Sequence, residues 1–279
     1  MTISDCRYVG MGGTMFIDFH LMHRFMGVSR MISLERDPKM HLRSSFNCPF
    51  DFISVRKQSV AQFLASDTDD ARTIYWLDYD DGFGPELTAD IMSLGTRLKP
   101  GGFAFVTAFA DPPGALGKNT KQQRLDYFQQ HLGDFSVGLT EDDMENAAYP
   151  NTVRKILVAA FKNAFAPRMD GQFEILFQIQ YKDSAQMVTV GGCFCKPSQA
   201  PNIRRRVKTD LPFLLKNPPY NLRSLNLTAR ERVMFDMAVT KSEPNDQSAS
   251  LIALGFKAQD LDAYRDMIRF IPRYYESII

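Results

Sequence analysis

Short apolar segments alternate with stretches of helical periodicity from residue 7 to residue 108. The apolar segments predict strands at residues 7–9, 31–34, 50–55, 73–77 and 103–108. Between them, apolar residues recur every three or four positions, which predicts helices at residues 15–26, 38–46, 59–65 and 85–98. Strands that alternate with helices in this way indicate βαβ units and a parallel sheet.

The pattern changes after residue 111. Polar helices are predicted at 121–131 and 140–146, and a more amphipathic helix at 152–165. Two β-rich segments, 173–181 and 187–195, follow with a short polar connection, which is typical of an antiparallel hairpin.

The last part of the chain reads as a separate, mainly helical appendage. We place the boundary so that residues 1–197 form the sheet domain and residues 198–279 the appendage. Within the appendage, helices are predicted near 228–239 and 258–268, with a polar loop at 242–248.

Composition narrows the possible partners. Of the 279 residues, 44% are hydrophobic and 23% charged, which is the balance of a soluble globular protein. The formal net charge of +1 argues against a broad nucleic-acid-binding face, which needs an excess of Lys and Arg. No signal peptide and no membrane span is recognised, so we expect a cytoplasmic protein. Cys193 and Cys195 lack a second Cys or His pair nearby, so buried reduced thiols are expected rather than a zinc site.

A glycine cluster lies between the first strand and the first helix. Gly10, Gly12 and Gly13 let the backbone approach a ligand closely and leave helix N-terminal amides free to meet polar groups. Glu35 ends the second strand, where a carboxylate can accept hydrogen bonds from both ribose hydroxyls. Together they predict a nucleotide-cofactor pocket.

Four motifs in order resemble the class I S-adenosylmethionine (SAM)-dependent methyltransferases. They are Gly-x-Gly-Gly after the first strand, Leu34-Glu35, Leu77-Asp78-Tyr79-Asp80, and the turn Leu98-Lys99-Pro100-Gly101-Gly102. The resemblance covers residues 5–197 and implies a Rossmann-like seven-stranded sheet, mostly parallel, with an antiparallel terminal hairpin. Shorter stretches, such as Trp76-Leu77-Asp78-Tyr79-Asp80, also resemble a bacterial group described as "putative O-methyltransferases".

The resemblance implies a cofactor and its binding residues. It assigns the methionine part of SAM to Gly10, Gly12 and Gly13, the ribose to Glu35, the adenine to Gln58 or Ser59, and the methyl-donating end to Asp78. Two positions depart from the family pattern. Tyr8 stands where the family has an acidic residue, and residues 56–58 lack the acid that usually follows the third strand.

The acceptor chemistry is less specific. Methyl transfer from a sulfonium needs mainly alignment, although a hydroxyl acceptor would also benefit from a general base. Asp80 and Asp81 are the candidate catalytic residues, because they follow a strand at the edge where open α/β sheets bind ligands. Asp111 could join them around a hard cation. The acids before Gly82 also suit a turn, however, and we predict no metal.

Two other functions compete with a methyltransferase. A dinucleotide dehydrogenase would need a glycine at Met15 to complete its G-x-G-x-x-G fingerprint. A binding or regulatory module that keeps the fold without catalysis would act through a protein partner, and Tyr8 is consistent with it. The leading prediction is a SAM-dependent methyltransferase with an unidentified oxygen or nitrogen acceptor, and with a protein partner or a homodimer left open.

Overall fold

The computed structural model divides the chain into two compact units. It describes residues 2–80, 82–113, 120–182, 185–215, 220–222, 225–240 and 245–268. Unit 1 comprises Met1–Gln180 and Ser184–Tyr220, and unit 2 comprises Tyr181–Asp183 and Asn221–Ile279. Helix α7 (Ala200–Asp210), beyond the predicted boundary at 197, is part of unit 1. The boundary itself stays a prediction.

The sheet has eight strands in the order β3-β2-β1-β4-β5-β7-β6-β8. Their bounds are β1 Arg7–Gly10, β2 Arg30–Leu34, β3 Ile53–Arg56, β4 Thr73–Tyr79, β5 Phe103–Phe109, β6 Gln172–Lys182, β7 Gln186–Cys195 and β8 Tyr220–Leu222. Strands β1 to β5 pair in parallel, and β7 pairs antiparallel with β5. The predicted α/β fold with an antiparallel end is confirmed, and β8 adds a strand to the seven expected.

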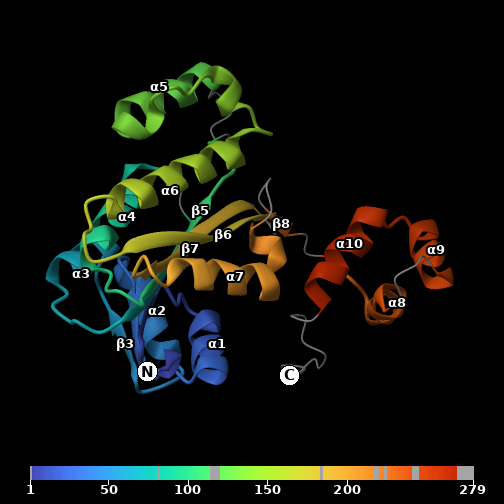
Figure 1. Ribbon diagram of the computed structural model, residues 1–279, viewed down its shortest axis with the longest axis horizontal. Helices are drawn as coiled ribbons and strands as arrows, with labels where there is room; N and C mark the ends of the chain where they lie inside the picture. The colour runs from blue at the N-terminus through green and yellow to red at the C-terminus, as the bar shows by residue number, and fades with distance from the viewer. Residues whose placement is uncertain are drawn as a thin grey trace. The chain divides into compact units, whose positions relative to one another are not determined.

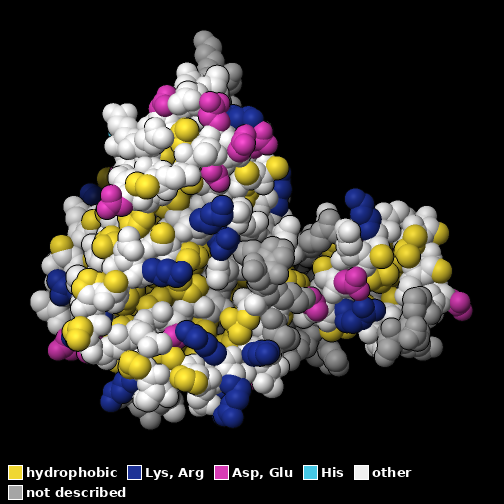
Figure 2. Space-filling model, turned by 45° about the horizontal axis from the view of Figure 1, so that its top comes forward, with side chains coloured by type: hydrophobic (Ala, Val, Ile, Leu, Met, Phe, Trp, Pro, Cys, Tyr) yellow, Lys and Arg dark blue, Asp and Glu magenta, His cyan; other side chains and the backbone are white. Residues whose placement is uncertain are grey.

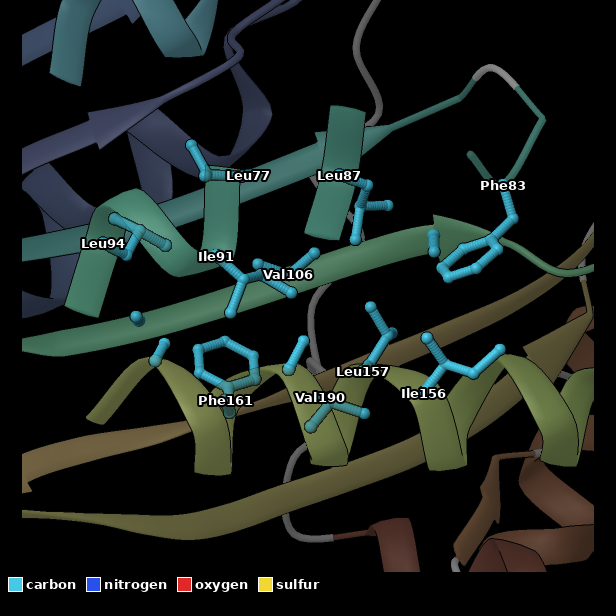
Figure 3. Packing of buried hydrophobic residues seen from close by; sticks show 14 of the residues in the cluster. Leu77, Phe83, Leu87, Ile91, Leu94, Val106, Ile156, Leu157, Phe161 and Val190 are labelled. Carbon is cyan, nitrogen blue, oxygen red and sulfur yellow. The ribbon is translucent and has the colours of Figure 1, made fainter. Parts of the chain in front are cut away.

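Helices cover both faces of the sheet (Figure 1). Those of unit 1 are α1 Ile17–Met26, α2 Pro38–Asn47, α3 Val60–Ser66, α4 Pro85–Arg97, α5 Lys121–His131, α6 Tyr149–Phe165 and α7. Buried residues of α3, α4 and α6 form one core with the sheet, and Phe16 and Phe19 beside and in α1 form a second core. Figure 3 shows α4 and α6 side chains, among them Ile91 and Phe161, pointing toward one another near Val106 of β5.

Unit 2 has a core of its own. Helices α8 Ala229–Val239, α9 Asp246–Ala253 and α10 Ala258–Met267 surround the buried side chains of Phe235, Leu251 and Tyr264. The phenolic hydroxyl of Tyr264 donates to Asp236 at 2.8 Å. No helix within the described ranges combines the length and hydrophobicity that crossing a membrane would require.

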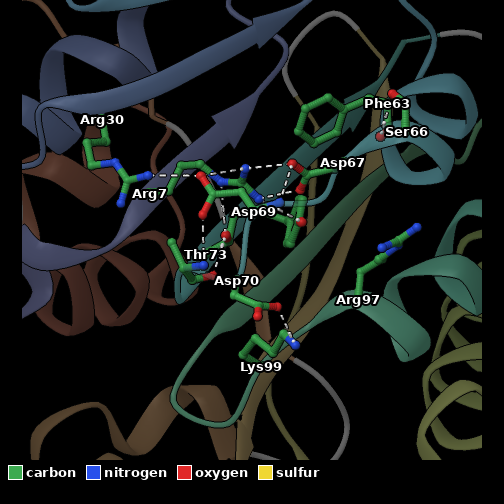
Figure 4. A network of polar contacts seen from close by, with 12 residues as sticks. Arg7, Arg30, Phe63, Ser66, Asp67, Asp69, Asp70, Thr73, Arg97 and Lys99 are labelled. Atoms are coloured by element: carbon green, nitrogen blue, oxygen red, sulfur yellow. Dashed lines mark hydrogen bonds and ion pairs between the residues drawn. The ribbon is translucent and has the colours of Figure 1, made fainter.

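An ion pair is buried at the amino end of the strands (Figure 4). Arg7 begins β1, and its side chain is 4% exposed. Its guanidinium donates to Asp67 Oδ1 at 2.8 Å and to Thr73 Oγ1 at 3.1 Å, and it lies 3.3 Å from Asp69. This network links β1 to β4 and to the loop before β4.

Three predicted elements differ from the structure. Helix α1 begins at Ile17 rather than near residue 15, because Phe16 adopts a left-handed conformation (φ 51°) and the preceding turn extends through it. The polar helix predicted at 140–146 is shorter, a 3₁₀ helix at Glu141–Met144. The polar loop predicted at 242–248 overlaps α9, because the Asn245 side chain accepts from the Ser248 amide and starts the helix.

The environment of the cysteines and the distribution of surface charge agree with what the composition predicts. Cys193 and Cys195 are free thiols, 3% and 2% exposed, and burial raises the pKa of Cys193 to about 12. Figure 2 shows one face of the molecule, where acidic side chains gather at the upper end of unit 1 and lysines and arginines are scattered over the rest. This face carries both signs of charge.

Candidate functional site

The glycine cluster lies where the order of the strands changes direction. Strand β1 is flanked by β2 and β4, and Gly10 pairs with Ser33 on one side and Trp76 on the other. The chain moves outward to β3 first and then to β5 on the opposite side. Open α/β sheets bind ligands at such a point, beyond the carboxyl ends of the strands. This register places Glu35 and Asp78 on either side of the glycines.

The turn from β1 to α1 exposes backbone at one position and packs tightly at another. The Gly12 amide donates to Ser33 Oγ at 3.1 Å, and the Phe16 amide donates to the Gly12 carbonyl at 2.9 Å. A Cβ on Gly12 would lie 2.7 Å from the Phe16 ring, so this position requires glycine. Gly13 has φ 54°, and a Cβ there would meet nothing within 4 Å. A ligand can therefore approach the backbone at Gly13.

Glu35 lies against this turn. Burial raises the pKa of Glu35, the negative charge of Asp80 adds to the increase, and the backbone amide of Gly13 opposes it. The backbone amides of Glu35 and Gln58 both donate to the Arg56 carbonyl at 3.0 Å, so Gln58 follows β3 beside Glu35. The structure thus brings Gly13, Glu35, Gln58 and Asp80 to one edge of the sheet.

The end of β4 contributes two exposed acids with a partly buried tyrosine between them. Asp78 and Asp80 are exposed, whereas the Tyr79 hydroxyl donates to Asp90 Oδ2 of α4 at 2.6 Å. Burial raises the pKa of Asp90, which is 6% exposed. This bond anchors the strand end to α4, while both aspartates remain accessible. Asp81, the other candidate catalytic residue, lies outside the described residues.

The sequence reasoning missed a buried pair beside the glycines. The hydroxyl of Tyr8, which is 0% exposed, donates to the carboxylate of Asp18 in the first turn of α1. Burial raises the pKa of Tyr8 well above its ordinary value, and the charges of Asp18 and Asp78 add to it. The sequence did mark this position, because Tyr8 stands where the family has an acidic residue. The spacing of residues could not show, however, that Tyr8 bonds to Asp18.

The arrangement offers acceptors for ligand hydroxyls and a carboxylate near the sheet edge. Asp111 is engaged elsewhere, since its Oδ2 accepts from the Gln186 amide at 3.0 Å. Within the described ranges, no group of three or more His, Cys, Asp or Glu side chains is arranged to hold a metal ion. The chemistry available at this edge is hydrogen bonding and proton transfer by carboxylates.

Comparison with known proteins gives one match along the whole length. A family model described as "Putative O-methyltransferase" matches residues 1–279. A search of curated proteins found no match.

Solved structures show more distant similarity. A putative S-adenosylmethionine-dependent methyltransferase from Listeria monocytogenes shares 9% identity over 70% of this chain and 94% of its own, with a TM-score of 0.45. The N-methyltransferase NodS from Bradyrhizobium japonicum shares 12% identity over 68% and 86%, with a TM-score of 0.39. LepI, solved with SAH and a substrate analogue, shares 9% identity over 68% of this chain, with a TM-score of 0.40. This chain spans 43% of LepI.

Proposed function

The chain belongs to the family described as "putative O-methyltransferases", and from this premise we propose that it transfers the methyl group of SAM to a hydroxyl at the carboxyl edge of its sheet. That it is a SAM-dependent methyltransferase follows from the family. The acceptor atom and the residues assigned below are our proposal. The observation that carries them is the convergence of Gly13, Glu35 and Asp80 at the switch point between β1 and β4.

The residues present fit SAM. The open backbone at Gly13, together with Gly10 and Gly12, would hold the methionine part, and Glu35 would accept hydrogen bonds from the ribose. Gln58, beside Glu35 through their shared bond to the Arg56 carbonyl, would flank the adenine. Asp78, on the opposite side of the turn, would line the methyl-donating end. The sulfonium of SAM supplies an activated methyl group, so the protein must mainly align the acceptor.

The description of the family favours a hydroxyl acceptor, and an exposed carboxylate lies where a base for it is needed. Asp80 is exposed at the end of β4, within electrostatic reach of Glu35. As a general base it would take the hydroxyl proton while the acceptor oxygen bonds to the methyl carbon, whose bond to sulfur would break to leave SAH. Asp81 is the second candidate for this role. An amine acceptor could use the same carboxylate, so the acceptor atom needs a direct test.

The cofactor assignment is tested by calorimetry. The purified chain should bind SAM and S-adenosylhomocysteine (SAH), and should not bind NAD or ATP. Glu35→Ala should weaken SAM binding by about 1.5–3 kcal/mol for each hydrogen bond lost to the carboxylate. Glu86→Ala, which removes an exposed carboxylate of α4, is the matched control and should leave the affinity unchanged. Unaltered binding by Glu35→Ala would show that the pocket has been misassigned.

The catalytic assignment is tested by turnover. SAH formation with pools of phenols, alcohols and amines identifies the acceptor class. Asp80→Asn should lower kcat by about 10²–10⁴-fold while the SAM affinity changes little, because the base acts on the acceptor. Full turnover by Asp80→Asn would show that Asp80 is not the general base, and would leave the assignment of the SAM site unaffected. SAM binding without any SAH product would favour the inactive binding module.

A further inference from the structure

The Tyr8–Asp18 pair places a carboxylate directly against the glycine turn. A Cβ built on Gly10 would lie 2.9 Å from the Tyr8 hydroxyl oxygen and 3.1 Å from Asp18 Oδ2. Gly10 is the last residue of β1, and Asp18 belongs to the first turn of α1. The carboxylate therefore lies beside the turn whose backbone the methionine part of SAM would contact.

The partners of this carboxylate are neutral. Burial raises the pKa of Asp18, whereas the hydroxyl of Tyr8 and the backbone amides of Asp18 and Phe19 lower it. Among the described residues, no lysine, arginine or histidine forms an ion pair with Asp18. A partly desolvated carboxylate is stabilised most by a cation, and the part of the chain that the structure describes places none there. A cationic ligand group would supply the missing charge.

The surroundings also favour a cation over an anion. Asp78, at the end of β4, acts on the Tyr8 hydroxyl from the neighbouring strand, since its charge contributes to the raised pKa of Tyr8. The carboxylate of Asp18 accepts from the Tyr8 hydroxyl, and the negative charge of Asp78, farther along the chain on β4, acts on the same hydroxyl. The charge of Asp18 lies at the turn, and that of Asp78 adds to it from the end of β4.

Resting on the proposed use of SAM, we propose that Asp18 binds the α-ammonium group of SAM, with the Tyr8 hydroxyl fixing the orientation of the carboxylate. An ammonium group carries N–H donors that a carboxylate accepts in charge-assisted hydrogen bonds, which the sulfonium of SAM cannot offer. Asp18 thereby supplies, from the first turn of α1, the negative charge that is absent at Tyr8. The departure from the family pattern at Tyr8 would thus be compensated by a carboxylate that Tyr8 itself contacts.

Three ligands separate the groups involved. SAM carries both the ammonium and the sulfonium, SAH keeps the ammonium alone, and 5′-methylthioadenosine has neither. Calorimetry with all three should be run on the full chain and on Asp18→Asn, which is isosteric and still accepts from Tyr8. Tyr8→Phe removes the hydroxyl that orients the carboxylate. Asp51→Asn, which changes an exposed acid in the turn before β3, is the charge-matched control.

Asp18→Asn should weaken SAM and SAH by about ten- to a hundredfold and leave 5′-methylthioadenosine within about twofold of the parent. Tyr8→Phe should show the same selectivity with a smaller loss, and Asp51→Asn no change. Thermal unfolding without ligand shows whether each variant is folded.

Each of the other outcomes contradicts a specific part of the proposal. Equal losses for all three ligands would make the pair structural, and a loss for SAM but not SAH would place Asp18 at the sulfonium. Unchanged affinities for Asp18→Asn would end this inference while the proposed function stands. A folded parent that binds neither SAM nor SAH would instead overturn the proposed cofactor site, and this inference with it.

Discussion

At the scale of single residues, burial and charge divide the acids of this chain into two groups. Asp18, Glu35 and Asp90 have raised pKa values, chiefly because burial disfavours their charged forms. For Asp67, burial alone would raise the pKa, but the hydrogen bond and charge of Arg7 lower it below its usual value. Asp67 therefore contributes stability, whereas the first group is costly to keep ionised in the folded chain.

The Asp67 pair predicts a change of stability in acid. Because its folded pKa is below the unfolded value of about 3.9, its contribution is complete above that pH and is lost as the pH falls through the folded pKa. Asp67→Asn should lower the free energy of unfolding at pH 7 by about 3–5 kcal/mol, since Arg7 is left buried with less compensation. Asp69, 3.3 Å from Arg7, will reduce this loss.

Urea unfolding at pH 7, 5, 4 and 3 measures the effect of Asp67→Asn. The difference in unfolding free energy between parent and variant should narrow below pH 4. The acids whose pKa is raised by burial contribute equally to both proteins, so they do not affect this difference. Asp70→Asn is the control, because Asp70 pairs with Lys99 at an exposed surface. A difference that stays constant down to pH 3 would contradict the assignment.

At the scale of elements, most of the sheet could be predicted because its signals are local. The apolar run at 73–77 lies within β4, and the glycines after residue 9 lie at the end of β1 and in the turn that follows it. Gly27 ends α1 at φ 70°, as expected for a helix C-terminus. The start of α1 could not be predicted, because the left-handed Phe16 depends on packing with Phe19 and Gly12. Helix α9 was missed because its apolar face consists of few residues, with Leu251 buried.

The contact between α4 and α6 gives a prediction at this scale. A Cβ on Gly95 of α4 would lie 2.2 Å from the Ala164 carbonyl oxygen of α6. Alanine normally stabilises a helix relative to glycine, but here the helices must separate. Gly95→Ala should lower the free energy of unfolding by about 1–3 kcal/mol.

Urea denaturation of Gly95→Ala is compared with Thr96→Ala, an exposed neighbour on the same helix. Thr96→Ala should leave stability unchanged or raise it slightly. If Gly95→Ala is as stable as the parent, α4 and α6 do not pack as closely at Gly95 and Ala164 as the structure shows.

At the scale of the whole molecule, each unit has its own core. The cofactor residues assigned here, from Gly10 to Asp78, all belong to unit 1. Among the residues that the structure describes, the core of unit 2 is formed by a small set of buried side chains around Phe235, which is 0% exposed. Small cores provide limited stability, so we expect unit 2 to unfold before unit 1.

Phe235→Ala tests this separation. Removing a buried phenylalanine should lower the stability of unit 2 by about 3–5 kcal/mol and leave the SAM affinity of the full chain unchanged. Differential scanning calorimetry should show an earlier transition moving to lower temperature while the later one stays. Leu157→Ala, in the core of unit 1, should move the later transition instead. A single transition that shifts with either variant would show that the units unfold together.

The two ends of strand β1 have different roles. Arg7 at its start belongs to the buried ion-pair network, and Gly10 at its end belongs to the turn that we propose contacts SAM. Substitutions in the loops beyond Gly10, Glu35 and Asp78 therefore do not touch the charges that hold the opposite edge. If the proposed site is correct, such a division would make the protein a tolerant starting point for laboratory evolution, in which loop libraries vary the acceptor side while the amino-terminal edge of the sheet is left as it is.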